Sequence, residues 1–204
     1  MSKITTVFFD LGGVLLELRP DKTVNHLAEC SGLDRETVEN SFPLEDYYQF
    51  ERGIMDESRF FKLWQEAMGG IALPLTDFYT AWDNLIGHEL ATSTILTKIK
   101  PYHQVWLLSN TNAHHIRYQT PKYSFFNQVD GKIYSYLEGY RKPEPEIFNL
   151  AMERAGATPE ESLFIDDMQV NVDQARKMGI TTIHFTSPEE LEIELKLLGL
   201  AGLV

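Results

Sequence analysis

Two short apolar runs of this chain end in carboxylates, and they constrain its fold more than any other feature. Val7-Phe8-Phe9-Asp10 lies near the start, and Leu163-Phe164-Ile165-Asp166-Asp167 lies far downstream. Each run has the length and composition of a buried parallel strand. Ligands of open α/β sheets bind beyond the carboxyl ends of the strands, so neighbouring strands would bring three carboxylates into one crevice. Crowded carboxylates repel one another unless a cation or a shared proton neutralises them, and the sequence therefore predicts a divalent metal site.

The rest of the chain after residue 88 alternates in the same way between strand and helix patterns. Strand patterns are found at 5–10, 104–109, 132–136, 162–166 and 181–185. Helical patterns are found at 89–99, 113–127 (in broken form), 144–156, 170–178 and 188–199. Strands separated by segments of helical length predict βαβ units, and therefore an α/β fold with a parallel sheet.

Residues 20–87 differ from this pattern because they contain helix signals and no convincing strand. Four helices are expected, at 22–31, 35–41, 57–68 and 77–86, with Asp21, Asp34, Asp56 and Thr76 as candidate N-terminal caps. We therefore expect a helical domain of residues 17–87, inserted after the first strand of an α/β domain that comprises residues 1–16 and 88–204.

Charge and composition narrow the class of partner. The chain has 204 residues, a formal net charge of −12 and 18 scattered Lys and Arg residues, so a nucleic-acid partner is not expected. It has no apolar stretch of 18 residues, and a membrane partner is not expected either. The single cysteine, Cys30, excludes an intrachain disulfide and suits a cytoplasmic location. Its helical context predicts a small buried side chain.

The segment Asp10-Leu11-Gly12-Gly13 offers two interpretations. A carboxylate at a strand end can act as a nucleophile or as a metal ligand. The two glycines let the backbone approach a ligand closely, which makes the Gly12 carbonyl available as a hard oxygen ligand for Mg²⁺. In the alternative interpretation Asp10 only caps a turn, and this segment alone does not decide between the two.

Two further segments offer groups that bind anions. Ser109 and Asn110 follow a strand and open a helix, where backbone amides and polar side chains form an anion site. The same residue types are also the usual helix caps. Lys142 precedes Pro143, which holds it in an extended conformation and lets it direct its ammonium group at a phosphate or a carboxylate. The alternative is an ordinary solvated lysine.

The acidic pair at the end of the downstream strand is the fourth candidate segment. Adjacent side chains at a strand end point in different directions, so we expect Asp167 to be the closer metal ligand and Asp166 to lie near it. Asn171 follows by about one helical turn and is placed to orient them. Acidic residues also favour helix N-termini, but that does not explain two acids directly after an apolar strand.

Taken in order, these four segments resemble the motifs of the haloacid dehalogenase superfamily of phosphohydrolases. Asp10-Leu11-Gly12-Gly13-Val14 resembles the first motif, Ser109-Asn110 the second, Lys142-Pro143 the third, and Asp166-Asp167 with Asn171 the fourth. The resemblance implies a Rossmann-like sheet with an inserted cap of four helices. The chain is also similar to bacterial phosphatases of α-D-glucose 1-phosphate and to the N-terminal phosphatase domain of epoxide hydrolases. Phe50-Glu51-Arg52-Gly53, followed by Phe60, carries that narrower resemblance.

The resemblance implies that the chain hydrolyses a small phosphomonoester, with a sugar phosphate favoured. Asp10 would attack phosphorus to form an aspartyl-phosphate, which water then hydrolyses. The implied cofactor is Mg²⁺, held by Asp10, the Gly12 carbonyl and Asp167, with Asp166 nearby. Ser109, Asn110 and Lys142 would bind the phosphate, and Lys142 would also offset the charge of Asp10.

At Gly12 the chain departs from the family pattern. Many phosphatases of the family have an aspartate there, which protonates the leaving group and activates water, a role worth about 10²–10⁴-fold in rate. His114 and His115 are candidate substitutes. The missing aspartate keeps open a catalytically weak protein that binds a phosphorylated ligand, and it ranks a phosphomutase lower.

A metal-free 2-haloacid dehalogenase on the same fold is the other alternative. In that enzyme Asp10 would attack carbon. The acidic pair Asp166-Asp167 argues against it, because the pair would repel an anionic substrate in the absence of a metal.

Selection of the substrate is expected to depend on residues of the helical domain. Its aromatic residues fit a core better than a platform for a sugar; they are Tyr47, Tyr48, Phe50, Trp64 and Trp82. Glu51 and Arg52 are candidates to face the cleft. The sequence does not fix the oligomeric state and is compatible with a monomer.

Overall fold

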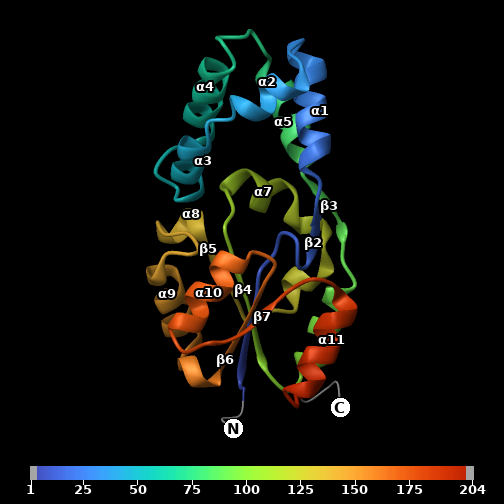
Figure 1. Ribbon diagram of the computed structural model, residues 1–204, viewed down its shortest axis with the longest axis vertical. Helices are drawn as coiled ribbons and strands as arrows, with labels where there is room; N and C mark the ends of the chain where they lie inside the picture. Colours follow the sequence, from blue (N-terminus) through green and yellow to red (C-terminus); the bar gives the residue numbers. More distant parts are fainter. Residues whose placement is uncertain (1–3, 201–204) are drawn as a thin grey trace.

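A five-stranded parallel sheet, in the order β5-β4-β1-β6-β7, forms the centre of the α/β part of the protein (Figure 1). The structure is a computed structural model and describes residues 4–200. The strands are β1 (Thr6–Phe9), β4 (Gln104–Ser109), β5 (Gly131–Tyr134), β6 (Ser162–Asp166) and β7 (Thr181–His184). The predicted α/β fold is confirmed, and each predicted strand agrees with an observed strand to within two residues.

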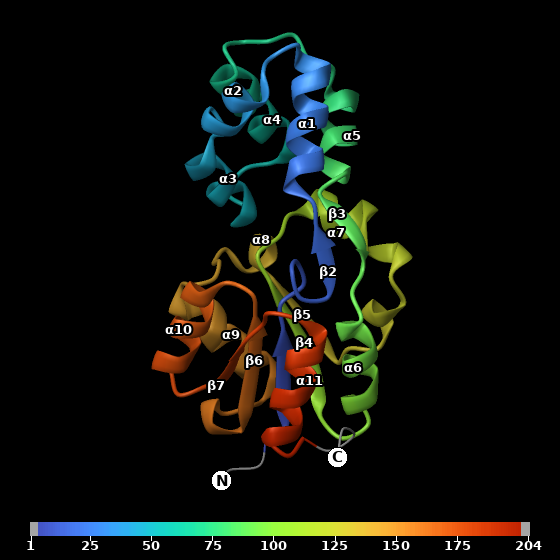
Figure 2. The same cartoon turned by 45° about the vertical axis from the view of Figure 1, so that its right-hand side comes forward.

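Helices cover both faces of the sheet, which explains why its central strands are apolar throughout. Val7 and Phe9 belong to a core shared with α6 (Thr92–Ile99) and α11 (Pro188–Leu197). Phe8 points the other way. It belongs to a core shared with α9 (Pro145–Ala155) and α10 (Gln169–Lys177). Figure 2 shows α9 and α10 on one side of the sheet and α6 and α11 on the other.

The register of the three central strands aligns the polar groups at their carboxyl ends. Phe9 of β1 is level with Leu107 of β4 on one side and with Ile165 of β6 on the other. The residues that follow, Asp10 and Asp166, therefore lie at the same edge of the sheet. This is the edge where open α/β sheets bind ligands.

A separate group of helices follows β1 in the chain and packs around its own core. These helices are α1 (Pro20–Ser31), α2 (Arg35–Asn40), α3 (Leu44–Glu51), α4 (Glu57–Ala67) and α5 (Leu75–Asp83). We call residues 20–83 the helical insertion. Its core consists of aromatic and aliphatic side chains from all five helices. In both views it lies beyond the carboxyl edge of the sheet (Figures 1 and 2).

Within the described residues the insertion has five helices, and the prediction of four was wrong. The missed helix, α3, begins after Pro43, and no side chain caps its N-terminus. Capping by Asp34 and Asp56 is confirmed, since each carboxylate accepts a backbone N–H at 2.8 Å. The other two predicted caps were wrong, because α1 is preceded by Arg19 and α5 by Pro74.

Two short strands that the sequence did not reveal join the insertion to the sheet. β2 (Leu16–Leu18) pairs antiparallel with β3 (Ile86–Glu89). At three and four residues, these strands are too short to produce a clear periodic pattern.

The remaining elements are short and lie around the sheet. They are α7 (Ala113–Tyr118), η1 (Thr120–Lys122), η2 (Ser124–Asn127), α8 (Ser135–Glu138) and η3 (Pro159–Glu161). Cys30 is exposed, so the prediction of a buried side chain was wrong. Among residues 4–200, none of the helices has the length and apolar character needed to span a bilayer.

Candidate active site

Asp10 lies at the carboxyl end of β1 and is held by its neighbours on the sheet. Its backbone N–H donates to the carbonyl of Ile165 at 2.9 Å. Its Oδ1 accepts the backbone N–H of Leu11 at 2.7 Å and lies 2.8 Å from the Lys142 ammonium. The carboxylate is buried, and the Leu11 N–H and the Lys142 ammonium orient it.

Lys142 reaches this site from the loop that precedes α9. Its side chain is 1% exposed, and its Nζ lies 2.8 Å from Asp10 Oδ1 and 2.6 Å from Asp166 Oδ2. Burying an ammonium group is costly unless carboxylates compensate it, and here two do so. Burial acts to lower the pKa of Lys142, but the two carboxylates outweigh it and the net shift is upward. The group is thus a fixed positive charge.

The two members of the acidic pair have different environments. Asp166 is fully buried, and besides Lys142 it accepts the Met168 backbone N–H at 2.8 Å and the Asn171 side chain at 3.0 and 3.1 Å. Asp167 is partly exposed and lines the cavity described below. The structure thus places Asp166 beside the lysine and leaves Asp167 at the opening.

Gly13 allows Asp167 to approach the first loop. Its φ angle is +80°, and a Cβ built at this position would lie 2.3 Å from Asp167 Oδ2. Any residue with a side chain would be strained in that conformation and would displace the carboxylate. The second glycine of the motif is therefore required both by its backbone angle and by the space around it.

The backbone of Lys142 is fixed by Asn110. The Asn110 side chain accepts the Lys142 N–H at 2.7 Å and donates to the Lys142 carbonyl at 2.9 Å. Both halves of the amide are therefore engaged by the loop that carries the lysine. Ser109 is buried next to it and lines the same cavity, with its hydroxyl 3.3 Å from the Asn110 carbonyl.

Negative charge is concentrated at this point. Burial raises the pKa of Asp10 from its usual 3.8 to about 8; repulsion by Asp166 and Asp167 adds to the rise, while Lys142 opposes it. The pKa of Asp167 is also raised, by burial first and by Asp166 second. A single lysine cannot neutralise three carboxylates, so the site favours binding of a further cation.

The donor set of this cluster fits a hard divalent cation. One oxygen each from Asp10, Asp166 and Asp167 lie within 4.8 Å of one another. Gly12 lines the cavity beside them, and its backbone carbonyl is an oxygen donor of the same kind. Mg²⁺ prefers such oxygen ligands and usually takes only one or two carboxylates from a protein.

A cavity of about 290 Å³ opens above the carboxylates and is closed on its far side by the helical insertion. Asp10, Ser109 and Lys142 line its sheet side, and Tyr47, Tyr48 and Glu51 of α3 line the side formed by the insertion. Phe50, Trp64 and Trp82 are buried in the core of the insertion, as expected, and Tyr47 packs against that core. Tyr47 and Tyr48 also line the cavity.

The two candidate histidines diverge although they are adjacent in α7. His114 points at the insertion, where its Nε2 lies 2.7 Å from Asp83 Oδ1. His115 lines the cavity, but burial lowers its pKa to about 4. A neutral imidazole with such a pKa is a weak proton donor near pH 7. Neither ring reproduces the acid that is missing at Gly12.

Sequence reasoning passed over Arg141 as a residue of the cavity. Its guanidinium lies 3.0 and 3.1 Å from Glu51 Oε2, and it packs over the ring of Tyr48 with 3.9 Å to the ring centroid. The sequence indicates this pair only indirectly. Glu51 needs a cationic partner if it is buried, but the sequence does not say which residue supplies it.

Comparison with known proteins finds similar sequences and structures. The model of the haloacid dehalogenase-like hydrolase family matches residues 4–179. D-ribitol-5-phosphate phosphatase of Bacteroides thetaiotaomicron is 27% identical over 187 residues, which are 88% of this chain and 90% of that protein. Sesquiterpene phosphatase of Aspergillus oryzae is 27% identical over 195 residues, 92% of this chain and 93% of the other.

A solved structure extends the similarity to three dimensions. It is that of a family enzyme from Bacteroides thetaiotaomicron in complex with magnesium and inorganic phosphate. The two chains superpose with a TM-score of 0.80 at 28% identity, over 90% of this chain and 95% of the other.

Proposed function

Since this chain belongs to the haloacid dehalogenase-like hydrolase family, we propose that it is a Mg²⁺-dependent phosphatase that hydrolyses a small phosphomonoester through an aspartyl-phosphate on Asp10. One observation carries the proposal: the Lys142 ammonium lies 2.8 Å from Asp10 and 2.6 Å from Asp166, while a third carboxylate, Asp167, remains at the cavity. Three carboxylates against one ammonium leave this set negatively charged. A divalent cation would offset that charge and would allow a phosphate to bind.

In the proposed reaction a carboxylate oxygen of Asp10 attacks phosphorus and the P–O bond to the alcohol breaks. The leaving oxygen takes its proton from water, because position 12 is a glycine. Lys142 and Ser109 bind the phosphoryl oxygens, and Lys142 opposes the protonation of Asp10 that burial and the two other acids favour. Mg²⁺, held by Asp10, Asp167 and the Gly12 carbonyl, would supply positive charge that stabilises the phosphoryl oxygens. Water then attacks the acyl-phosphate, and phosphate is released. Phosphoryl transfer depends mainly on positioning and charge stabilisation, which these residues provide.

We propose a different role for Asn110 from the one expected. Both halves of its side-chain amide are bonded to the Lys142 backbone, which supports a role in holding the lysine rather than in binding phosphate. Asp166 likewise orients Lys142, and this supports Asp167 as the metal ligand of the acidic pair.

The nature of the cavity supports a small polar substrate, and we propose a sugar or polyol phosphate. The space of about 290 Å³ is lined by Tyr47 and Tyr48 and by the charged residues Glu51 and Arg141, whose side-chain types can hydrogen-bond to hydroxyl groups. We infer that residues 17–87 serve as a cap over the substrate. A cytoplasmic location is proposed on the single cysteine.

A phosphate-release screen tests the proposed function. Purified protein is given p-nitrophenyl phosphate, α-D-glucose 1-phosphate, D-ribitol 5-phosphate, nucleotides and flavin mononucleotide, in Mg²⁺ or in EDTA. We expect release to fall by at least about 100-fold in EDTA and to return when Mg²⁺ is added back. Phosphate release that EDTA leaves unchanged, or chloride release from 2-haloacids without metal, would contradict the proposal.

A further inference from the structure

Three consecutive residues at the end of α3, Glu51-Arg52-Gly53, all contact the α/β part of the protein. Glu51 is paired with Arg141, at 3.0 Å between Oε2 and Nη2. Arg52 is paired with Glu144. Gly53 lies so close to α8 that a Cβ built on it would be 2.1 Å from the Tyr136 carbonyl oxygen, and its φ angle is +68°.

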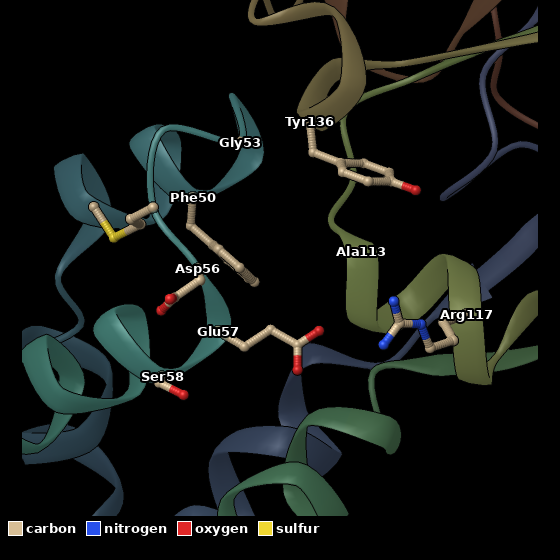
Figure 3. A pocket seen from close by; sticks show the side chains of 9 residues that line it. Phe50, Gly53, Asp56, Glu57, Ser58, Ala113, Arg117 and Tyr136 are labelled. Atoms are coloured by element: carbon tan, nitrogen blue, oxygen red, sulfur yellow. The ribbon is translucent and has the colours of Figure 1, made fainter.

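Figure 3 shows Gly53 and Tyr136 at a second cavity, about 300 Å³ in volume, between the insertion and the helices α7 and α8. Gly53 and Phe50 lie on one side of that cavity, and Tyr136 lies across from them. In Figures 1 and 2, α3 lies next to α8. The end of α3 is therefore the part of the insertion that meets the loop before α9.

The two ion pairs are on either side of Lys142 in the chain. Arg141 precedes the lysine directly, and Glu144 follows it by two residues. The loop is also closed on itself, because the Glu144 N–H donates to the Arg141 carbonyl at 2.8 Å and the Arg141 N–H donates to Glu144 Oε2 at 3.3 Å. Displacing either end of this loop displaces the lysine between them.

Burial and charge indicate that the contact is specific. Glu51 is 5% exposed, and its pKa is raised by burial while Arg141 opposes the rise. A buried carboxylate without Arg141 would be strongly disfavoured. The two pairs also have opposite polarity, acid to base at Glu51 and base to acid at Arg52, so a shift of α3 by one residue would set like charges against each other.

We propose that Glu51-Arg52-Gly53 is a positioning element, through which the docked insertion sets the place of the Lys142 ammonium between Asp10 and Asp166. The proposal rests on the proposed function in so far as Lys142 serves phosphoryl transfer. It gives the insertion a role in catalysis that is separate from contact with the substrate.

The pair Arg52–Glu144 provides the test, because neither side chain lines the catalytic cavity. Arg52→Glu and Glu144→Arg each place like charges together, and the double variant restores a pair of reversed polarity. We expect each single change to lower kcat for p-nitrophenyl phosphate by about 10- to 100-fold, since small misplacement of a catalytic group has effects of that size. KM should change less than about threefold. The double variant should recover part of kcat, because the bond from the Arg141 N–H to Glu144 Oε2 is not restored.

Arg35→Glu is the matched control. Arg35 also belongs to the insertion and pairs with acidic residues, but its partners Asp21 and Glu39 lie within the insertion itself. This variant should retain kcat. Single reversals that only lower the melting temperature, or a double variant as impaired as the worse single variant, would overturn the proposal.

Hydrogen–deuterium exchange supplies a readout that does not depend on turnover. The Lys142 N–H donates to Asn110 Oδ1 at 2.7 Å and should exchange slowly in the native protein. We expect its exchange to quicken at least about tenfold in both single variants and to return in the double variant. Unchanged exchange in the single variants would overturn the positioning role, whether or not the wild-type protein releases phosphate. Absence of phosphate release from the wild type would refute the proposed function instead.

Discussion

Replacement of Asp10 by asparagine should abolish phosphate release. The amide keeps the shape of the side chain but is a far weaker nucleophile, so no acyl-phosphate forms. We expect turnover of p-nitrophenyl phosphate to fall on the order of 10⁴-fold or more, as is found when the nucleophile of a covalent mechanism is removed. Steady-state release of phosphate measures the effect. An Asp10→Asn protein as active as the wild type would refute the assignment of the nucleophile.

The same variant should fold at least as stably as the wild type when no divalent cation is present. Burial raises the pKa of Asp10 from 3.8 to about 8, so between these values the folded state holds a proton that the unfolded state does not. The stability that this group contributes is therefore lost as the pH rises through that window. Asparagine does not titrate, and the melting temperature of the variant should be less sensitive to pH. A variant that melts well below the wild type in the absence of divalent cations would contradict this prediction.

Replacement of Lys142 by methionine should have the second-largest effect and should damage both rate and stability. Methionine keeps much of the volume of the side chain but leaves Asp10 and Asp166 without their shared cation. We expect turnover to fall about 10²–10³-fold, because a charge aimed at the reacting group is lost. Breaking a buried ion pair by removal of one partner costs about 3–5 kcal/mol of stability. Kinetics and chemical denaturation near pH 7 test the two effects.

The matched control is Lys132→Met in β5. Lys132 is exposed, so this change also replaces a lysine by methionine but removes no buried charge. That change should alter stability by no more than about 0.5 kcal/mol. The stability gap between Lys142→Met and the wild type should narrow as the pH falls through about 8, because Asp10 can then take up a proton in place of its contact with the ammonium. A gap that stays constant from pH 6 to pH 9 would contradict the charge argument.

The part of the site that the sequence predicts well is the part held by the sheet. Asp10 and Asp166 follow apolar runs whose parallel pairing is a strong local signal, so their shared edge could be predicted from the order of residues alone. Lys142 could be placed only through the order of the motifs. Its contact with Asp166 joins residues 24 positions apart and has no periodic signature.

The part that the sequence did not predict depends on contacts across the chain. Arg141 and Glu51 are 90 residues apart, and nothing local indicates that they meet. Asn110 has the composition of a helix cap or an anion site, and only the fold shows its amide bonded to the Lys142 backbone. His114 and His115 are adjacent, but successive residues of a helix point about 100° apart, so their partners differ.

The central claim is that Asp10 carries the phosphoryl group during turnover, and trapping of the intermediate tests it most directly. The enzyme is mixed with p-nitrophenyl phosphate and Mg²⁺, quenched during turnover and reduced with borohydride, which converts an aspartyl-phosphate to homoserine. Mass spectrometry of the peptide that contains Asp10 should then find homoserine at position 10 in the wild type and not in Asp10→Asn. Active enzyme with an unmodified Asp10, or with homoserine at another aspartate, would contradict the claim.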